Sequence, residues 1–158
     1  MFPPSRIVCL TEETVETLYL VGEQDRIAGI SGYVVRPPQA RREKPRVSAF
    51  TSANIDKILA LQPDLVLTFS DLQADIAADL IRRGIEVHAF NQRTVTGILD
   101  MIRTVGAMVG VSERAEELVE MLELKRRDEA SPPNIRPPRR CSPVPASGFG
   151  AGNGQSAQ

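Results

Sequence analysis

The chain has 158 residues, of which 42% are apolar and 25% charged, and its formal net charge at pH 7 is −1. This length allows one domain with a substantial core, and no apolar run is long enough to cross a membrane as a helix. The balanced charge and the 4% content of aromatic residues argue against a nucleic-acid partner.

Strands alternate with helices along most of the chain. Residues 6–10 form a short apolar strand, and Thr11 follows as the expected N-cap of a helix. Glu12 and Glu13 then fall in the first helical turn, where the helix dipole favours acidic side chains. A second strand is predicted at 27–31, and the long polar loop that follows contains three prolines.

The same alternation continues beyond this loop. Ser52 is the expected N-cap of a helix at 54–61, and Asp71 is expected to cap the helix after the next strand. The remaining elements are a brief extended segment at Val47 and Ser48, a buried strand at 65–69, a helix at 72–83, a strand at 85–90, a helix from the cap Thr94 to about Val109, and a charged helix from Glu113. This order predicts an α/β fold with a doubly wound, mostly parallel sheet.

The last 28 residues differ sharply from the rest. All 20 acidic residues lie between Glu12 and Glu129, whereas 131–158 contain three arginines, six prolines and four glycines. Such a composition cannot offset the entropy of ordering the backbone, so the sequence predicts a disordered Pro/Arg/Gly-rich tail there. Two origins fit this segment: an ordinary flexible tail, or out-of-frame or unrelated sequence attached to a broken-off domain.

Catalytic and metal chemistry find little support in the sequence. The two cysteines have no CxxC partner, and Cys9 is expected to be a buried apolar residue. His88, the one histidine, is expected to be a sheet residue rather than a base. Neither GxGxxG nor GxxxxGK[ST] occurs, which argues against a nucleotide-binding loop. We therefore predict no enzymatic activity, no metal site and no cofactor, with a flavodoxin-like signalling domain as the alternative.

The strand order alone nominates a ligand site. In open α/β sheets, ligands bind beyond the carboxyl ends of the strands. The residues that follow the predicted strands are Thr11, Glu12 and Glu13, then Gly32 and Tyr33, then Ser70 and Asp71, and finally Asn91 and Gln92. For Thr11, Asp71 and Thr94, helix capping is the better explanation of each single residue.

Four segments share a pattern with one known family. They are RIVCLTEETVETLYLVG, GISGYVVRPPQA, VSAFTSANIDKILALQPDLVL and GIEVHAFN. The most specific part is NIDKILALQPDLVL, which joins a helix, a turn and a buried strand in a fixed order. Over residues 6–127 the chain resembles the solute-binding proteins of cobalamin and ferric-siderophore ABC importers.

The resemblance implies one of two α/β lobes that are joined by a rigid helix. It implies an amino-terminal ligand-binding lobe at 1–112, the start of the bridging helix at 113–130, and then the tail at 131–158. The implied function is binding, without catalysis, of a small-molecule ligand, cobalamin or a ferric siderophore, as the substrate-binding component of an ABC importer. The implied protein partner is an ABC permease.

Two departures from the family pattern stand out. The second lobe is missing from the sequence, so we expect a truncated chain. The alternative to a functional binding protein is then a truncated remnant that binds weakly or not at all. The family normally works in the periplasm, whereas the first residues lack a signal-peptide pattern, which predicts a cytoplasmic location without membrane insertion.

The resemblance also implies site residues, which coincide with the sheet edge nominated above. The ligand-facing positions fall on Thr11, Glu12, Glu13, Tyr33, Phe50, Phe69, Ser70 and Asp71. For Phe50 and Phe69, a position in the core is the alternative. The permease contact falls on Asp56, where a glutamate is more usual, and the alternative for Asp56 is a first-turn acid favoured by the helix dipole.

Overall fold

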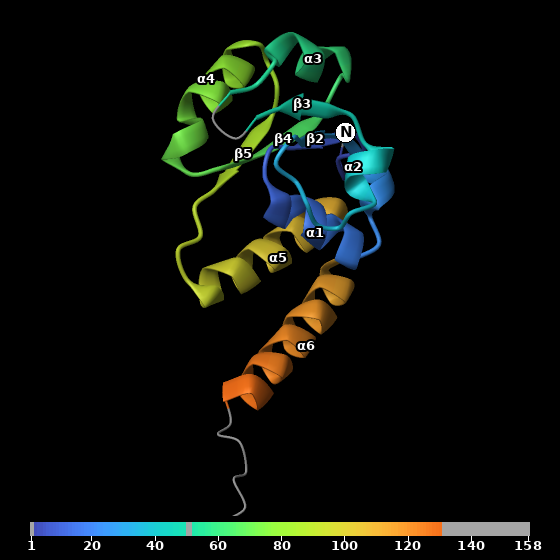
Figure 1. Ribbon diagram of the computed structural model, residues 1–158, viewed down its shortest axis with the longest axis vertical. Coiled ribbons are helices and arrows are strands. Elements are labelled where there is room, and N and C mark those ends of the chain that lie inside the picture. The colour runs from blue at the N-terminus through green and yellow to red at the C-terminus, as the bar shows by residue number, and fades with distance from the viewer. Residues whose placement is uncertain (1, 50–51, 131–158) are drawn as a thin grey trace, which may run out of the picture.

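A parallel β-sheet forms the centre of the molecule (Figure 1). The computed structural model describes residues 2–49 and 52–130. Within them, five strands pair in the order β3-β2-β1-β4-β5, and every pairing is parallel. The strands are β1 (Ile7–Cys9), β2 (Ile27–Ser31), β3 (Arg46–Ser48), β4 (Leu65–Phe69) and β5 (Val87–Phe90). This topology confirms the predicted α/β fold; the predicted tail at 131–158 lies outside the described residues.

Helices cover both faces of the sheet (Figure 1). The helices α1 (Glu12–Leu20) and α5 (Val95–Val109) pack on one face, and α3 (Ile55–Ala60) and α4 (Ala74–Arg82) pack on the other. The last helix, α6 (Ser112–Ala130), packs along α5 and then extends away from the sheet. The sheet therefore separates two cores.

The alternation of side chains along the central strands explains these two cores. In β1, Ile7 and Cys9 join the core beneath α1 and α5, while Val8 joins the core beneath α3 and α4. In β4, Leu67 and Val66 divide between the two cores in the same way, and both are at most 1% exposed. The segment at 65–69, in which the buried Thr68 is the one polar residue, is typical of a strand covered on both faces, as the sequence predicted.

Several predicted boundaries are confirmed. The side chain of Thr94 caps α5 by accepting a hydrogen bond from the N–H of Gly97 at 3.0 Å. Gly110 ends the same helix in the left-handed region, with φ of 79°. The brief extended segment at Val47 and Ser48 belongs to β3, which pairs with β2.

Two predicted helix caps are wrong. Asn54, rather than Ser52, caps α3, and its side chain accepts a hydrogen bond from the N–H of Lys57 at 2.9 Å. Asp71 does not cap α4 but opens a short 3₁₀ helix, η2 (Asp71–Gln73), that precedes it. A side chain can cap only from the position directly before the first turn, so a shift of one or two residues in the helix start changes which residue caps it.

The polar loop after β2 contains a short helix, α2 (Ala40–Glu43), where the sequence predicted no element. Ala40 is fully buried in the core beneath α1. The hydroxyl of Tyr19 donates a hydrogen bond to Glu43 Oε2 at 2.8 Å and so connects α1 to α2. Because these contacts come from α1, far away in sequence, periodicity within four residues could not indicate the helix. Another short 3₁₀ helix, η1 (Gln24–Arg26), precedes β2.

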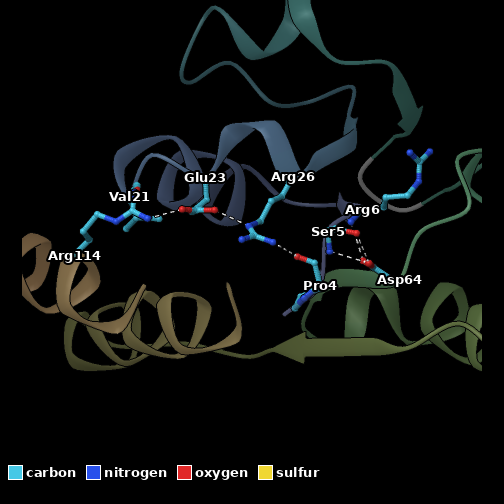
Figure 2. Close-up of polar contacts among 8 residues, drawn as sticks. All are labelled: Pro4, Ser5, Arg6, Val21, Glu23, Arg26, Asp64 and Arg114. Carbon is cyan, nitrogen blue, oxygen red and sulfur yellow. Dashed lines mark hydrogen bonds and ion pairs between the residues drawn. The ribbon is translucent and has the colours of Figure 1, made fainter. Parts of the chain in front are cut away.

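Polar contacts tie together the ends of the strands where the chain enters the sheet, here called the amino edge (Figure 2). The carboxylate of Asp64 accepts hydrogen bonds from the N–H of Ser5 at 2.7 Å, the hydroxyl of Ser5 at 3.0 Å and the N–H of Arg6 at 2.9 Å. Burial alone would raise the pKa of the Asp64 carboxyl, but these hydrogen bonds outweigh it and lower the pKa. Asp64 thereby fixes the entry of β1 beside the entry of β4.

The second group of contacts at the amino edge is centred on Glu23 (Figure 2). Its carboxylate lies 2.5 Å from Arg26 Nε and 2.5 Å from Arg114 Nη2, and its side chain is only 14% exposed. Arg26 also donates to the carbonyl of Pro4 at 2.8 Å, and Arg114 donates to the carbonyl of Val21 at 2.5 Å. Burial alone would raise the pKa of Glu23, but the two guanidinium groups outweigh it and lower the pKa. These contacts join α6 to the end of α1.

Candidate functional site

The opposite side of the sheet, here called the carboxyl edge, carries the residues that follow each strand. Because all the strands are parallel, these residues meet at one edge. The chain order reverses between the neighbours β1 and β4, since β2 and β3 lie on one side of β1 and β5 lies beyond β4. Such a switch point is where open α/β sheets bind ligands.

Gln73 connects the two strands at this switch point. Its side-chain oxygen accepts a hydrogen bond from the N–H of Phe69 at 2.9 Å, and its side-chain nitrogen donates to the carbonyl of Leu10 at 3.2 Å. The residue is 1% exposed. The sequence gives no indication of this role for Gln73, because a polar residue beside a helix start carries no signal that it is buried.

Ser70 occupies a strained position at the end of β4. Its backbone has φ of 56° and ψ of −178°, a region that L-residues rarely adopt. Its N–H donates to the carbonyl of Phe90 at 2.7 Å, and its hydroxyl accepts a hydrogen bond from the N–H of Leu72 at 3.3 Å. Ser70 is 8% exposed, so its side chain shapes the turn at the carboxyl edge and is largely hidden from solvent.

Thr11 is at the N-cap position of α1 but does not cap it with its side chain. Its hydroxyl lies 3.2 Å from the hydroxyl of Thr14, and the Thr14 hydroxyl donates a hydrogen bond to the carbonyl of Thr11. The capping role considered from the sequence is therefore wrong for the side chain. Thr11 is 4% exposed and is buried beneath the carboxyl edge rather than displayed on it.

The acidic residues at the start of α1 form a charged margin of the edge. Glu12 accepts a hydrogen bond from Arg36 Nε at 3.2 Å, and Glu16 Oε2 lies 4.0 Å from Arg36 Nη2. Glu13 is exposed. Arg36, in the loop after β2, is thus shared between two carboxylates, an arrangement that the sequence analysis did not predict.

Aromatic side chains of the predicted site lie at different depths. Tyr33, two residues beyond β2, is 64% exposed. Phe69 is the last residue of β4 and is partly buried against the core beneath α1 and α5, so it belongs both to the core and to the carboxyl edge. Phe50 lies outside the described residues.

Arg93, in the connection between β5 and α5, covers Phe69. The guanidinium carbon lies 5.9 Å from the centroid of the Phe69 ring. Arg93 Nε donates to Asn91 Oδ1 at 3.0 Å, and Arg93 Nη2 lies 3.4 Å from Asp71 Oδ1. The side chains of Arg93 and Asp71 are 64% and 82% exposed. Sequence reasoning missed Arg93, since a single arginine in a loop does not reveal which ring it contacts.

Asp56 lies in the first turn of α3, the helix that follows β3 in the chain. Its side chain is 93% exposed, and the nearest cation is Arg83, with Nη1 3.9 Å from Asp56 Oδ1. An acid this accessible is free to contact a partner, and the predicted permease contact of Asp56 stays a prediction.

Other reactive side chains have structural surroundings. His88 lies in β5 with its ring centroid 4.4 Å from that of Phe90, and burial lowers its pKa. Cys9 is fully buried, and burial raises the pKa of its thiol to about 12. Both positions match the sequence predictions. Within residues 2–49 and 52–130, no group of three or more His, Cys, Asp or Glu side chains is placed to hold a metal ion.

The described part of the chain also bears on membrane insertion. No helix there combines the length and apolar character needed to span a bilayer. The cytoplasmic location expected from the first residues stays a prediction.

Comparison with known proteins gives one family and several named relatives. Residues 7–130 match the sequence profile of a family described as periplasmic binding protein. The chain is 40% identical over 68 residues to a vitamin B12-binding protein of Vibrio cholerae serotype O1, which covers 43% of this chain and 24% of the relative. It is 27% identical over 123 residues to a vitamin B12-binding protein of Salmonella typhimurium, which covers 77% of this chain and 45% of that relative.

A solved structure agrees with these relatives. The crystal structure of the periplasmic vitamin B12-binding protein of Vibrio cholerae superimposes with a TM-score of 0.72 at 28% identity. The match covers 81% of this chain and 50% of that one. The chain thus spans about a quarter to a half of the length of these proteins.

Proposed function

Since the chain belongs to the periplasmic binding protein family, we propose that its carboxyl edge binds a corrinoid, with a ferric siderophore as the alternative ligand, and that it acts by binding without catalysis. The observation that carries the proposal is the carboxyl edge itself. There the switch point between β1 and β4 is flanked by the rings of Tyr33 and Phe69 and by the carboxylates of Glu12 and Asp71. Relatives named as vitamin B12-binding proteins support the choice of ligand.

These side chains suit the chemistry of a corrinoid. Cobalamin has a large flat macrocycle with amide side chains around its margin. The exposed ring of Tyr33 can lie against the macrocycle, because aromatic faces bury large apolar surfaces at little entropic cost. The amide N–H groups can donate to the carboxylates of Glu12, Glu13 and Asp71, and such hydrogen bonds to charged acceptors are the stronger kind.

The share of the relatives that this region covers sets an expectation for the affinity of the region by itself. The region covers half or less of its relatives, and we propose that their ligand contacts are divided between this region and the remainder. One edge alone leaves the ligand open to water on the other side, while the entropy of capturing the ligand is still lost. We therefore expect a dissociation constant of about 100 μM or weaker, equivalent to about −5.5 kcal/mol.

An ABC permease is the proposed macromolecular partner, with Asp56 as the contact. The support is the position and the 93% exposure of its side chain, which extends from the first turn of α3. In the same proposal, α6 begins a bridge from this lobe to the rest of a binding protein, and its course away from the sheet supports that role (Figure 1).

Equilibrium dialysis with cyanocobalamin, followed by its visible absorbance, tests the proposal. Saturable binding near 100 μM is expected, and Tyr33→Ala should weaken it about tenfold because the macrocycle loses its aromatic contact. Phe2→Ala is the matched control, since Phe2 is also exposed, at 78%, but precedes β1 at the other edge. Ferrichrome is tested in parallel as the ferric ligand.

The outcomes separate the alternatives. Binding that Tyr33→Ala and Phe2→Ala weaken equally would place the site elsewhere. Saturable binding of ferrichrome alone would replace the corrinoid by a ferric siderophore. If neither ligand shows saturable binding, the chain does not bind them and the proposal fails. A submicromolar dissociation constant in the monomer would contradict the proposal that this region supplies only part of the ligand contacts.

A further inference from the structure

Two arginines lie at the carboxyl edge, and their surroundings differ. Arg36 is shared between two acids, with Nε 3.2 Å from Glu12 and Nη2 4.0 Å from Glu16. Arg93 has one acid, Asp71, at 3.4 Å, and within the described residues no acceptor contacts its Nη1. Its charge is therefore the less completely neutralised of the two.

The pair between Arg93 and Asp71 is also weak. Both side chains are largely exposed, at 64% and 82%, and the N–O distance is long for a charge-assisted hydrogen bond. Ion pairs of this kind contribute little to stability, because water screens them and two exposed side chains must be ordered. An incoming anion can replace the Asp71 carboxylate at little cost.

Two other contacts orient the guanidinium of Arg93. Its Nε donates to Asn91 at 3.0 Å, and its guanidinium carbon lies 5.9 Å from the Phe69 ring centroid, within range of a cation–π interaction. Phe69 is itself held against the core. The guanidinium thus contacts Asn91 and the Phe69 ring and is paired with an exchangeable acid, Asp71.

We propose that Arg93 is a specificity-determining residue that selects ligands carrying a carboxylate at the margin of the macrocycle. The ligand carboxylate replaces Asp71 on the Nη groups of Arg93, while Nε keeps its bond to Asn91 and the guanidinium stays over Phe69. A planar guanidinium accommodates a carboxylate through two parallel hydrogen bonds, which a solvated lysine would not provide. This inference rests on the proposed corrinoid function and adds a charge preference to it.

A matched pair of ligands tests the charge preference. Cyanocobalamin carries no net charge, and mild hydrolysis of one of its propionamide groups gives a monocarboxylic acid of nearly the same shape. Both are measured by equilibrium dialysis against the full chain and against Arg93→Gln, which keeps a polar side chain but removes the charge. Arg82→Gln is the control, because Arg82 is also exposed and pairs with an acid, Asp79, but lies on α4.

The wild-type chain should bind the monocarboxylic acid more tightly than cyanocobalamin. Arg93→Gln should weaken binding of the acid about tenfold and that of cyanocobalamin less than about threefold, since only the acid loses a charge-assisted hydrogen bond. Asp71→Asn should tighten binding of the acid, because the substitution removes the carboxylate that occupies the Nη groups of Arg93. Arg82→Gln should leave both constants unchanged.

Each other result overturns the inference in a recognisable way. Equal weakening of both ligands by Arg93→Gln would show that Arg93 supports the shape of the edge without selecting charge. Tighter binding of cyanocobalamin than of the acid by the wild-type chain would show the opposite preference, and equal binding would show none. If the wild-type chain binds neither corrinoid, the proposed function itself fails and the inference fails with it.

Discussion

The two edges of the sheet use charged side chains differently. At the amino edge, Glu23 is 14% exposed and lies 2.5 Å from each of two arginines, and Asp64 accepts three hydrogen bonds from the segment that precedes β1. At the carboxyl edge, the pairs Arg36–Glu12 and Arg93–Asp71 are longer, at 3.2 and 3.4 Å, and more exposed. The shorter contacts of the half-buried Glu23 and Asp64 stabilise the fold, whereas the longer and more exposed pairs can be exchanged for a ligand.

The largest expected difference in stability between the edges comes from replacing one aspartate at each edge, Asp64 and Asp71. Asp64→Ala should lower the free energy of unfolding by about 2 kcal/mol, because the hydrogen-bond donors of Ser5 and Arg6 lose a charged acceptor. Asp71→Ala should change it by less than about 0.5 kcal/mol, since its one ion pair is exposed. Urea unfolding measures both variants, and equal losses would contradict the comparison.

A smaller effect is expected from Glu23, and it depends on pH. Glu23→Gln should lower the stability at pH 7 by about 1.5 kcal/mol, because two guanidinium groups lose their shared carboxylate. The pKa values of Glu23 and Asp64 are lowered in the folded chain, so their contribution is present above about pH 4 and is lost as the pH falls through the folded pKa values.

Urea unfolding between pH 7 and pH 2.5 follows this titration. The stability of the wild-type chain should fall more steeply in the acid range than that of Glu23→Gln, which has already lost one of the two groups. Glu12→Gln is the control from the carboxyl edge, and its stability should follow the wild-type curve. If the free energy of unfolding of all three proteins falls with pH at the same slope, the Glu23 carboxylate makes no pH-dependent contribution to stability.

The smallest expected effect has the opposite sign and lies at the carboxyl edge. Ser70→Gly should raise the free energy of unfolding by about 0.5 kcal/mol, since glycine adopts φ of 56° without strain while the hydrogen bond from Leu72 to the side chain is lost. Thermal unfolding with matched Ser70→Ala measures the change. A loss of stability in Ser70→Gly larger than that in Ser70→Ala would show that the backbone at Ser70 stores no strain.

The sequence predicted well those features that depend on neighbouring residues. The segment at 65–69 indicates a buried strand because four of its five side chains are apolar and they fall on both faces. The cap at Thr94 and the left-handed glycine at 110 are local signals at the ends of α5. Parallel order then follows from the alternation of strands and helices. The location of the candidate site at the carboxyl edge follows in turn, because parallel strands all end on the same side.

The sequence by itself thus determined the fold class, the order of elements and the edge at which a ligand is proposed to bind. Only the tertiary structure decided what each side chain does there. It buried Thr11 and Ser70, bridged β1 to β4 through Gln73, and set Arg93 over Phe69. The physical reason is that these contacts join residues from different strands and helices, and their distances depend on how the elements pack, which hydrophobic patterns along the chain do not specify.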